Sequence, residues 1–168
     1  MKRKWIFVVA ACLLLVSCNS LKRSDVVDIL IDNNYIRNNA GYYEKYEDNY
    51  FIRIGYRSSI AGYLESLRNY IGPGPIVLVD FGNNMSFNYH LNEDVMLYNV
   101  YCVENDLLEN SEVMYSFADE SFIVGDDGCK FDVENQEPLI TEFKAKRDLM
   151  NSELDKMSLN KKKLSLLK

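Results

Sequence analysis

The chain has 168 residues, of which 48% are hydrophobic and 26% charged, and 25 acidic against 19 basic side chains give it a net charge of −6. Residues 18–138 hold 8 Lys and Arg against 21 Asp and Glu, a balance of −13, whereas residues 139–168 hold 8 against 4, a balance of +4. The acidic body argues against nucleic acid as a partner, because phosphates repel carboxylates. It suits a cationic partner or simply solubility.

An apolar run follows a basic start at the amino terminus. Lys2, Arg3 and Lys4 precede residues 5–16, which are wholly apolar. A helix that crosses a bilayer needs about 20 apolar residues, so this run is short for a membrane span. The layout is that of a signal peptide covering residues 1–17, and we expect it to be removed.

The run ends in Leu15-Val16-Ser17-Cys18, which resembles the lipobox of bacterial lipoproteins. The resemblance covers only the amino-terminal segment. It implies that the thiol of Cys18 receives a diacylglyceryl group, that the chain is cut before this residue, and that the new amino terminus is acylated. Two or three acyl chains, at about 0.8 kcal/mol per buried CH₂, hold a protein on a bilayer durably. The alternatives are an uncleaved anchor helix and an ordinary buried cysteine.

This resemblance implies a lipid-anchored protein of the bacterial cell envelope. Asn19 follows the cysteine where an aspartate would favour the inner membrane in enterobacteria, so the outer membrane is favoured if the organism is Gram-negative. Residues 18–23 form a short lipidated tether, and its five residues after Cys18 span at most about 18 Å. Residues 24–168 are expected to form a single globular domain, since they suffice for one hydrophobic core.

The amino-terminal part of this domain predicts two helices and a strand. A short helix over residues 25–31 begins at Ser24, and a strand covers residues 50–56. A second helix begins at Ser58 or Ser59 and ends at Gly72-Pro73-Gly74-Pro75, because proline cannot continue it. Its apolar stripe is Ile60, Tyr63, Leu64, Leu67 and Ile71.

After Pro75 the apolar period changes to two, which is typical of strands. A hairpin joins residues 76–81 and 85–90 through Gly82-Asn83-Asn84. Further strands are predicted at residues 95–103, 112–117, 121–124 and 129–133. A basic carboxy-terminal helix covers residues 139–168, and its apolar stripe docks on the core or, alternatively, forms a dimer seam. The stripe is Phe143, Met150, Leu154, Met157 and Leu164.

These elements predict an α+β fold with an antiparallel sheet of about five to six strands, two short amino-terminal helices and a carboxy-terminal helix. Cys102 and Cys129 remain as thiols after processing, and an oxidising compartment favours a disulfide between them. In a simple meander their strands lie three spacings apart, about 14 Å, which exceeds the roughly 7 Å that a disulfide allows. A bond therefore requires curling or direct pairing of these strands, and two buried thiols are the alternative.

His90 is the only histidine, so a catalytic triad or a two-histidine zinc site would have to include it. The strand alternation places it outward, as a surface residue. The segment 126–137 does not fit a calcium loop. No nucleophile motif, metal set or phosphate-binding loop is found, so no catalytic residue, metal or cofactor is predicted.

Tyrosines are concentrated between residues 35 and 56, and a recognition surface for sugar or peptide would use Tyr42, Tyr43, Tyr46 and Tyr50. Packing of a half-buried segment explains the same residues. The first functional hypothesis is a non-enzymatic binding or structural role with a protein partner. The second is an inhibitor or immunity protein against a cationic toxin or lysozyme, and the third an envelope hydrolase.

Overall fold

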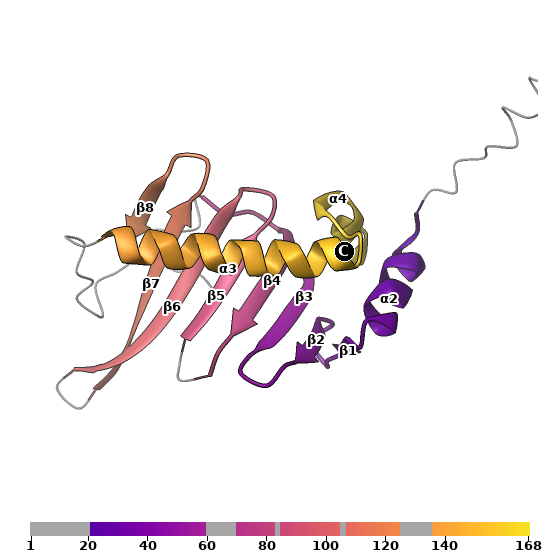
Figure 1. Cartoon of the computed structure of the whole chain (residues 1–168), viewed down its shortest axis with the longest axis horizontal. Coiled ribbons are helices and arrows are strands. Elements are labelled where there is room, and N and C mark those ends of the chain that lie inside the picture. Colours follow the sequence, from indigo (N-terminus) through magenta and orange to yellow (C-terminus); the bar gives the residue numbers. More distant parts are fainter. Residues whose placement is uncertain (1–20, 60–69, 83–84, 105–106, 125–135) are drawn as a thin grey trace, which may run out of the picture.

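The computed structural model describes residues 21–59, 70–82, 85–104, 107–124 and 136–168. Its centre is one antiparallel sheet of eight strands, in which each strand pairs with its neighbours in chain order (Figure 1). The strands are β1 (Ile36–Arg37), β2 (Tyr43–Tyr46), β3 (Phe51–Arg57), β4 (Gly74–Asp80), β5 (Met85–His90), β6 (Val95–Glu104), β7 (Leu107–Ser116) and β8 (Ser121–Val124). The described helices are α2 (Arg23–Asp32), α3 (Gln136–Lys156) and α4 (Lys161–Leu164), followed by the 3₁₀ turn η3 (Ser165–Leu167).

The predicted α+β class is therefore confirmed, but the sheet has eight strands and not five to six. The additional strands β1 and β2 lie in the tyrosine-rich segment. β1 has two residues, and β2 reads Tyr-Glu-Lys-Tyr, so neither shows the apolar alternation that marks a strand. The predicted strand at residues 50–56 and the hairpin of residues 76–90 are present as β3 and as β4 with β5. The second predicted helix and the strand at residues 129–133 lie almost wholly outside the described residues.

The first helix, α2, begins at Arg23 with Lys22 as its N-cap, earlier than the expected start at Ser24. The Lys22 backbone N–H donates to the Asp25 carboxylate at 2.8 Å, which satisfies an amide at the start of the helix. Val26 and Leu30 are fully buried and join the core. Ile31, expected on the same face, is 55% exposed, so the buried stripe of α2 is narrower than its apolar residues suggest.

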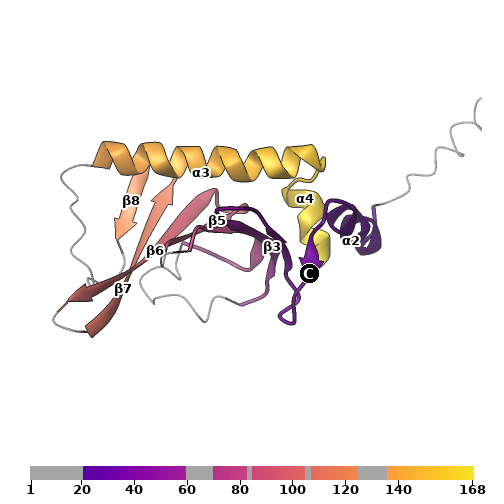
Figure 2. The same ribbon diagram turned by 60° about the horizontal axis from the view of Figure 1, so that its bottom comes forward.

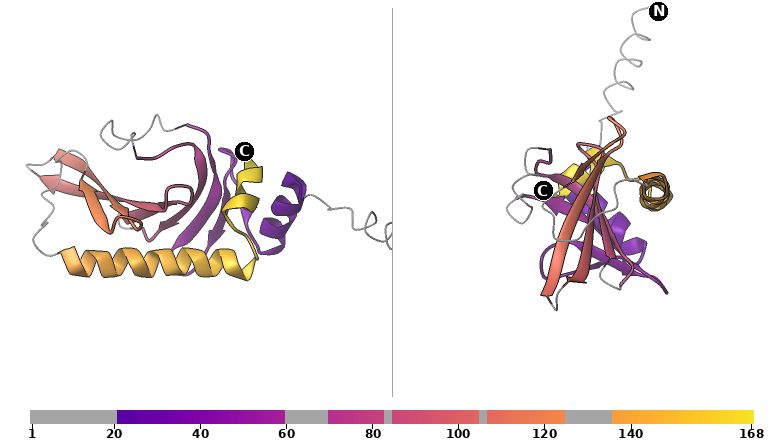
Figure 3. Two further views of the ribbon diagram at one scale, coloured as in Figure 1. Left: turned by 90° about the horizontal axis from the view of Figure 1, so that it is seen from above. Right: turned by 90° about the vertical axis from the view of Figure 1, so that its left-hand side faces the viewer.

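Helix α3 crosses the strands on one face of the twisted sheet in Figure 1, and it lies along the same side of the sheet in Figures 2 and 3. The strand residues beneath it point alternately toward the helix, which is the geometry of a pleated sheet. Together with α2, α4 and η3 they form one core cluster. Its strand members include Ile52, Ile54, Val77, Val79, Phe87, Tyr89, Met96, Tyr98 and Tyr115.

Phe143 is the centre of the contact between α3 and the sheet. Its ring is fully buried, and its centroid lies 5.8 Å from that of Phe87, 6.1 Å from Tyr98, 5.7 Å from Tyr115 and 5.8 Å from Phe122. Three of these pairs are edge-on, an arrangement that aromatic quadrupoles favour. One side chain therefore ties the helix to four strands.

The predicted apolar stripe of residues 139–168, which the structure divides between α3, the turn after it and α4, packs against the core, so its residues do not form an exposed dimer seam. Phe143, Met150 and Leu164 are fully buried, and Leu154 and Met157 are 3% and 6% exposed. Among the described helices, none combines the length and the apolar composition that a bilayer crossing requires.

The carboxy-terminal helix is not continuous over residues 139–168, contrary to the sequence-based prediction. It ends at Lys156, and Ser158 adopts φ = 52°. Leu159 N–H donates to the Leu154 carbonyl at 2.8 Å and Ser158 N–H to the Asp155 carbonyl at 2.9 Å. These bonds are the Schellman pattern that ends a helix, with a serine at the left-handed position where glycine is usual. The sequence therefore carried no obvious stop signal.

Candidate functional site

The first residues of the described fold, before and at the start of α2, lie next to its last residues, in α4 and η3. Residues 21–23 lead into α2, and residues 160–168 contain α4 and η3; we call these two segments together the basic end. In Figures 2 and 3, α2 and α4 are neighbours beyond the β3 side of the sheet. The buried residues Val26 and Leu30 of α2 share the core with Leu164 and Leu167. The core thus holds the two ends of the described chain together.

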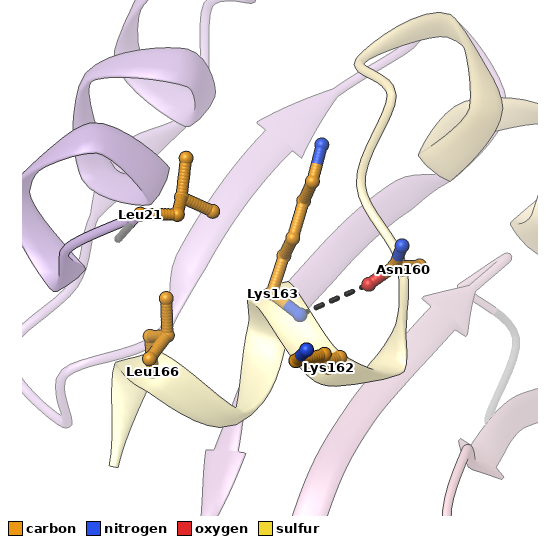
Figure 4. A pocket seen from close by; sticks show the side chains of 5 residues that line it. All are labelled: Leu21, Asn160, Lys162, Lys163 and Leu166. Carbon is orange, nitrogen blue, oxygen red and sulfur yellow. Dashed lines mark hydrogen bonds between the residues drawn. The ribbon is translucent and has the colours of Figure 1, made fainter. Parts of the chain in front are cut away.

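A cavity of about 340 Å³ opens at the basic end. Leu21 lines it from the segment before α2, and Leu166 lines it from η3 (Figure 4). Asn160, Lys162 and Lys163 are the other described residues that line it. Because a lysine stem is aliphatic, the cavity has apolar walls with ammonium groups at its margin.

Asn160 sets the position of the lysines. Its side chain accepts a hydrogen bond from the backbone N–H of Lys163 at 3.0 Å, so it caps the start of α4 (Figure 4). Lys161 Nζ donates to the Asn92 carbonyl at 3.2 Å, and Lys163 Nζ donates to the Ser158 carbonyl at 2.6 Å. The lysines are thereby fixed by carbonyl oxygens, which carry no net charge.

The basic end carries six cationic side chains. Within the described ranges, none of them forms an ion pair with a carboxylate. The sequence-based prediction treated the lysine run as the end of a long helix and missed the cavity. Asn160 before that run was the available signal, since asparagine favours helix starts. The cations are Lys22, Arg23, Lys161, Lys162, Lys163 and Lys168.

The four predicted recognition tyrosines do not form one surface. Tyr43 points into the core and is 3% exposed, so its assignment to a recognition surface was wrong. Tyr50 is half-buried and its ring packs 5.6 Å from that of Phe81. Tyr42, just before β2, and Tyr46 lie one and three positions from Tyr43, so strand alternation places them on the opposite face from it.

Tyr46 is 69% exposed and, with the half-buried Tyr42, belongs to a small cluster that we call the tyrosine surface. The Tyr46 ring lies 5.5 Å from that of Phe51, and the Arg53 guanidinium lies 5.8 Å from the Tyr42 ring and 5.4 Å from the Phe51 ring. Gly55 makes this possible, because a Cβ there would stand 2.3 Å from the Tyr42 ring. The tyrosine surface consists of Tyr42, Tyr46, Phe51 and Arg53.

Glu44 connects the residues of the tyrosine surface through hydrogen bonds. It accepts hydrogen bonds from Arg53 Nε at 2.7 Å, from Asn38 Nδ2 at 2.8 Å and from the Tyr46 hydroxyl at 3.2 Å. Burial opposes ionisation of this carboxyl, but the hydrogen bonds from Arg53 and Asn38 outweigh it and lower its pKa. The cluster is therefore an arrangement of aromatic rings and one cation that is held by hydrogen bonds to Glu44.

A second charged cluster joins α3 to the turn between β5 and β6. The Arg147 guanidinium donates to both Asp94 oxygens, at 2.7 and 2.6 Å, and the Tyr89 hydroxyl donates to Asp94 at 2.6 Å. Arg147 also lies 4.3 Å from the centre of the Phe117 ring. Bidentate pairing and ring contact fix the helix to the sheet, so this cluster has a structural role.

His90 is buried at 1% exposure, so its prediction as an outward surface residue was wrong. Strand alternation correctly placed His90 on the face of the sheet opposite to Phe87 and Tyr89. That second face is also buried, since Leu97 and Met114 on it are fully covered. His90 stands opposite Ile76 and Val95 in the sheet. Alternation identifies the face of a strand and not whether that face is covered.

The described residues Ser116 and Asp119 do not form a catalytic triad with His90. The register places Val95 between His90 and Ser116, two strand spacings or about 10 Å apart. The Ser116 hydroxyl donates to the Asp119 carboxylate at 2.8 Å. In the described part of the chain, no group of three or more His, Cys, Asp or Glu residues could hold a metal ion.

The remaining predicted site residues are the cysteines. Cys18 and Cys129 lie outside the described residues, and Cys102 lies on β6 opposite Glu109 of β7. The disulfide and the lipidation therefore stay predictions. No family model, no curated protein and no solved structure matches this chain.

Burial, followed by the charge of Arg57, lowers the pKa of His90 from 6.5 to about 4. Below pH 6.5 the unfolded chain therefore binds more protons than the folded chain. The contribution of neutral His90 to the free energy of unfolding is thus present above pH 6.5 and is lost as the pH falls toward 4. Urea unfolding should show that wild type loses about 2 to 3 kcal/mol more than His90→Gln between neutral pH and pH 4. An equal loss in the two proteins would contradict this assignment.

Proposed function

We propose that the chain is a lipid-anchored protein of the bacterial cell envelope that acts by binding and not by catalysis. One observation supports this most. Helix α2 begins at Arg23, within the predicted tether of residues 18–23 and five residues after Cys18. A lipid on Cys18 would thus hold a folded domain close to its membrane.

The tyrosine surface is the candidate site for a protein partner. Tyr46 is 69% exposed, yet Glu44 and Arg53 already fix its surroundings through hydrogen bonds of 2.6 to 3.2 Å. A preorganised aromatic cluster loses little conformational entropy on binding. Tyrosine and arginine are also the residue types that contribute most at protein interfaces. These properties support recognition, and the acidic body argues against nucleic acid.

The hydrolase hypothesis receives no support from the described residues. Ser116 is bonded to Asp119 and is separated from His90 by Val95, so the serine, the histidine and the acid do not converge. Catalysis by such a set requires mutual hydrogen-bonding distance. Binding is therefore the function that the site geometry supports best.

Replacing Cys18 by alanine should abolish the anchor, because acyl transfer needs the thiol. The wild-type protein should incorporate a clickable fatty acid and enter the detergent-rich phase, while Cys18→Ala should remain unlabelled and unprocessed. Cys12→Ala is the matched control, since it removes a thiol from the apolar run and keeps the run apolar. Labelling and processing of Cys18→Ala at the wild-type level would contradict the proposed function.

A second candidate is an inhibitor or immunity protein against a cationic toxin or lysozyme, which the balance of −13 over residues 18–138 favours. In a turbidity assay, the purified protein should slow cell-wall lysis by a cationic lysozyme at low salt. Raising the salt should weaken this inhibition, because screening acts on charge-steered association. No inhibition at low salt, or inhibition unchanged by salt, would contradict this candidate.

A further inference from the structure

The basic end has no described acidic partner of its own, although it lies on a protein of net charge −6. Lys161 and Lys163 are held by carbonyl oxygens, and Lys162 is exposed. Carbonyl contacts orient an ammonium group without neutralising its charge. The lysines therefore stay available for an anion.

Two acids of α2, Asp25 and Asp28, follow the first cations of the basic end in the chain. Asp25 accepts the Lys22 backbone N–H at 2.8 Å, as part of the start of α2. Asp28 lines a separate open depression with Arg23, Arg37 and Tyr43. None of the described residues that line the cavity carries a carboxylate. Two of these residues are lysines and two are leucines.

The chain itself limits what can lie against the basic end. Two residues, Asn19 and Ser20, separate Cys18 from Leu21, and three residue steps span at most about 10 Å. If Cys18 carries acyl chains, Leu21 and the cavity that it lines are held within this distance of the lipid headgroups. A bilayer is then the nearest large surface to the lysines.

We propose that the basic end docks on anionic phospholipid headgroups, with the lysines of α4 on the phosphates and Leu21 and Leu166 facing the interface. This inference rests on the proposed lipid anchor and specifies how the anchored domain is oriented. Basic residues beside a membrane attachment each strengthen its attraction to anionic lipid. Docking places α2 and α4 at the bilayer and directs the β8 end of the sheet away from it (Figure 1).

The orientation can be measured on the lipidated protein, because its only tryptophan, Trp5, lies in the predicted signal peptide. A tryptophan introduced into the processed chain is then a single reporter. Leu166→Trp places it in the cavity, and Lys168→Trp places it at an exposed position of the basic end, where it replaces one of the six cations. Ala118→Trp is the control, exposed in the turn before β8. Each variant is reconstituted in nanodiscs that contain a lipid with a headgroup-level quencher.

In nanodiscs of phosphatidylglycerol and phosphatidylcholine, the two reporters at the basic end should be quenched more than Ala118→Trp. In nanodiscs of phosphatidylcholine alone this difference should shrink. Lys162→Glu in the reporter background should lower the ratio of docked to undocked protein roughly tenfold. Lys144→Glu, an equal charge change at an exposed position of α3, should leave it unchanged.

Three results would overturn the inference, and they are distinguishable from failure of the anchor. Co-elution with nanodiscs but equal quenching at Leu166→Trp, Lys168→Trp and Ala118→Trp would overturn the docking alone. So would quenching that ignores phosphatidylglycerol, or equal effects of Lys162→Glu and Lys144→Glu. Failure of every variant to co-elute with nanodiscs would overturn the lipid anchor and, with it, the docking.

Discussion

The packing of α3 across one face of the sheet is the interaction on which the rest of the structure depends. Phe143 contacts rings from β5, β6, β7 and β8, and Met150 and Leu154 continue the same buried stripe. A meander of eight strands has mostly local pairings, and it needs a cover for the apolar face. Full burial of one aromatic side chain contributes on the order of 2 to 3 kcal/mol. Helix α3 supplies this cover and fixes the direction of the carboxy-terminal segment.

The direction of the carboxy-terminal segment decides where the lysines of α4 lie. The turn at Ser158 ends α3 and returns the chain over the amino-terminal helix, so that α4 and η3 pack beside α2. A continuous helix would have carried the lysines away from the tether. The turn instead brings Lys162 and Lys163 to the cavity that Leu21 lines. The position of the proposed membrane contact is therefore a consequence of core packing at the other end of the molecule.

Helices and strands with regular apolar spacing were predictable from the sequence. Features that depend on contacts with distant segments were not. The hairpin of β4 and β5 and the stripe of α3 show regular apolar spacing, and the structure has both. His90 was predicted to be exposed from strand alternation and Tyr43 from the clustering of tyrosines, but both are buried. Neither pattern shows whether a distant segment covers the residue. The turn at Ser158 lacked the usual glycine. The cavity of the basic end combines residues far apart in sequence, and no local pattern reveals such a site.

The most direct test of this account is peptide-level hydrogen exchange on Phe143→Leu, which should cost on the order of 1 to 2 kcal/mol. If docking of α3 holds the chain ends together, exchange should accelerate in α2 and in residues 161–167 as well as in α3. Faster exchange confined to α3, with α2 and the carboxy-terminal turn as protected as in wild type, would contradict the account.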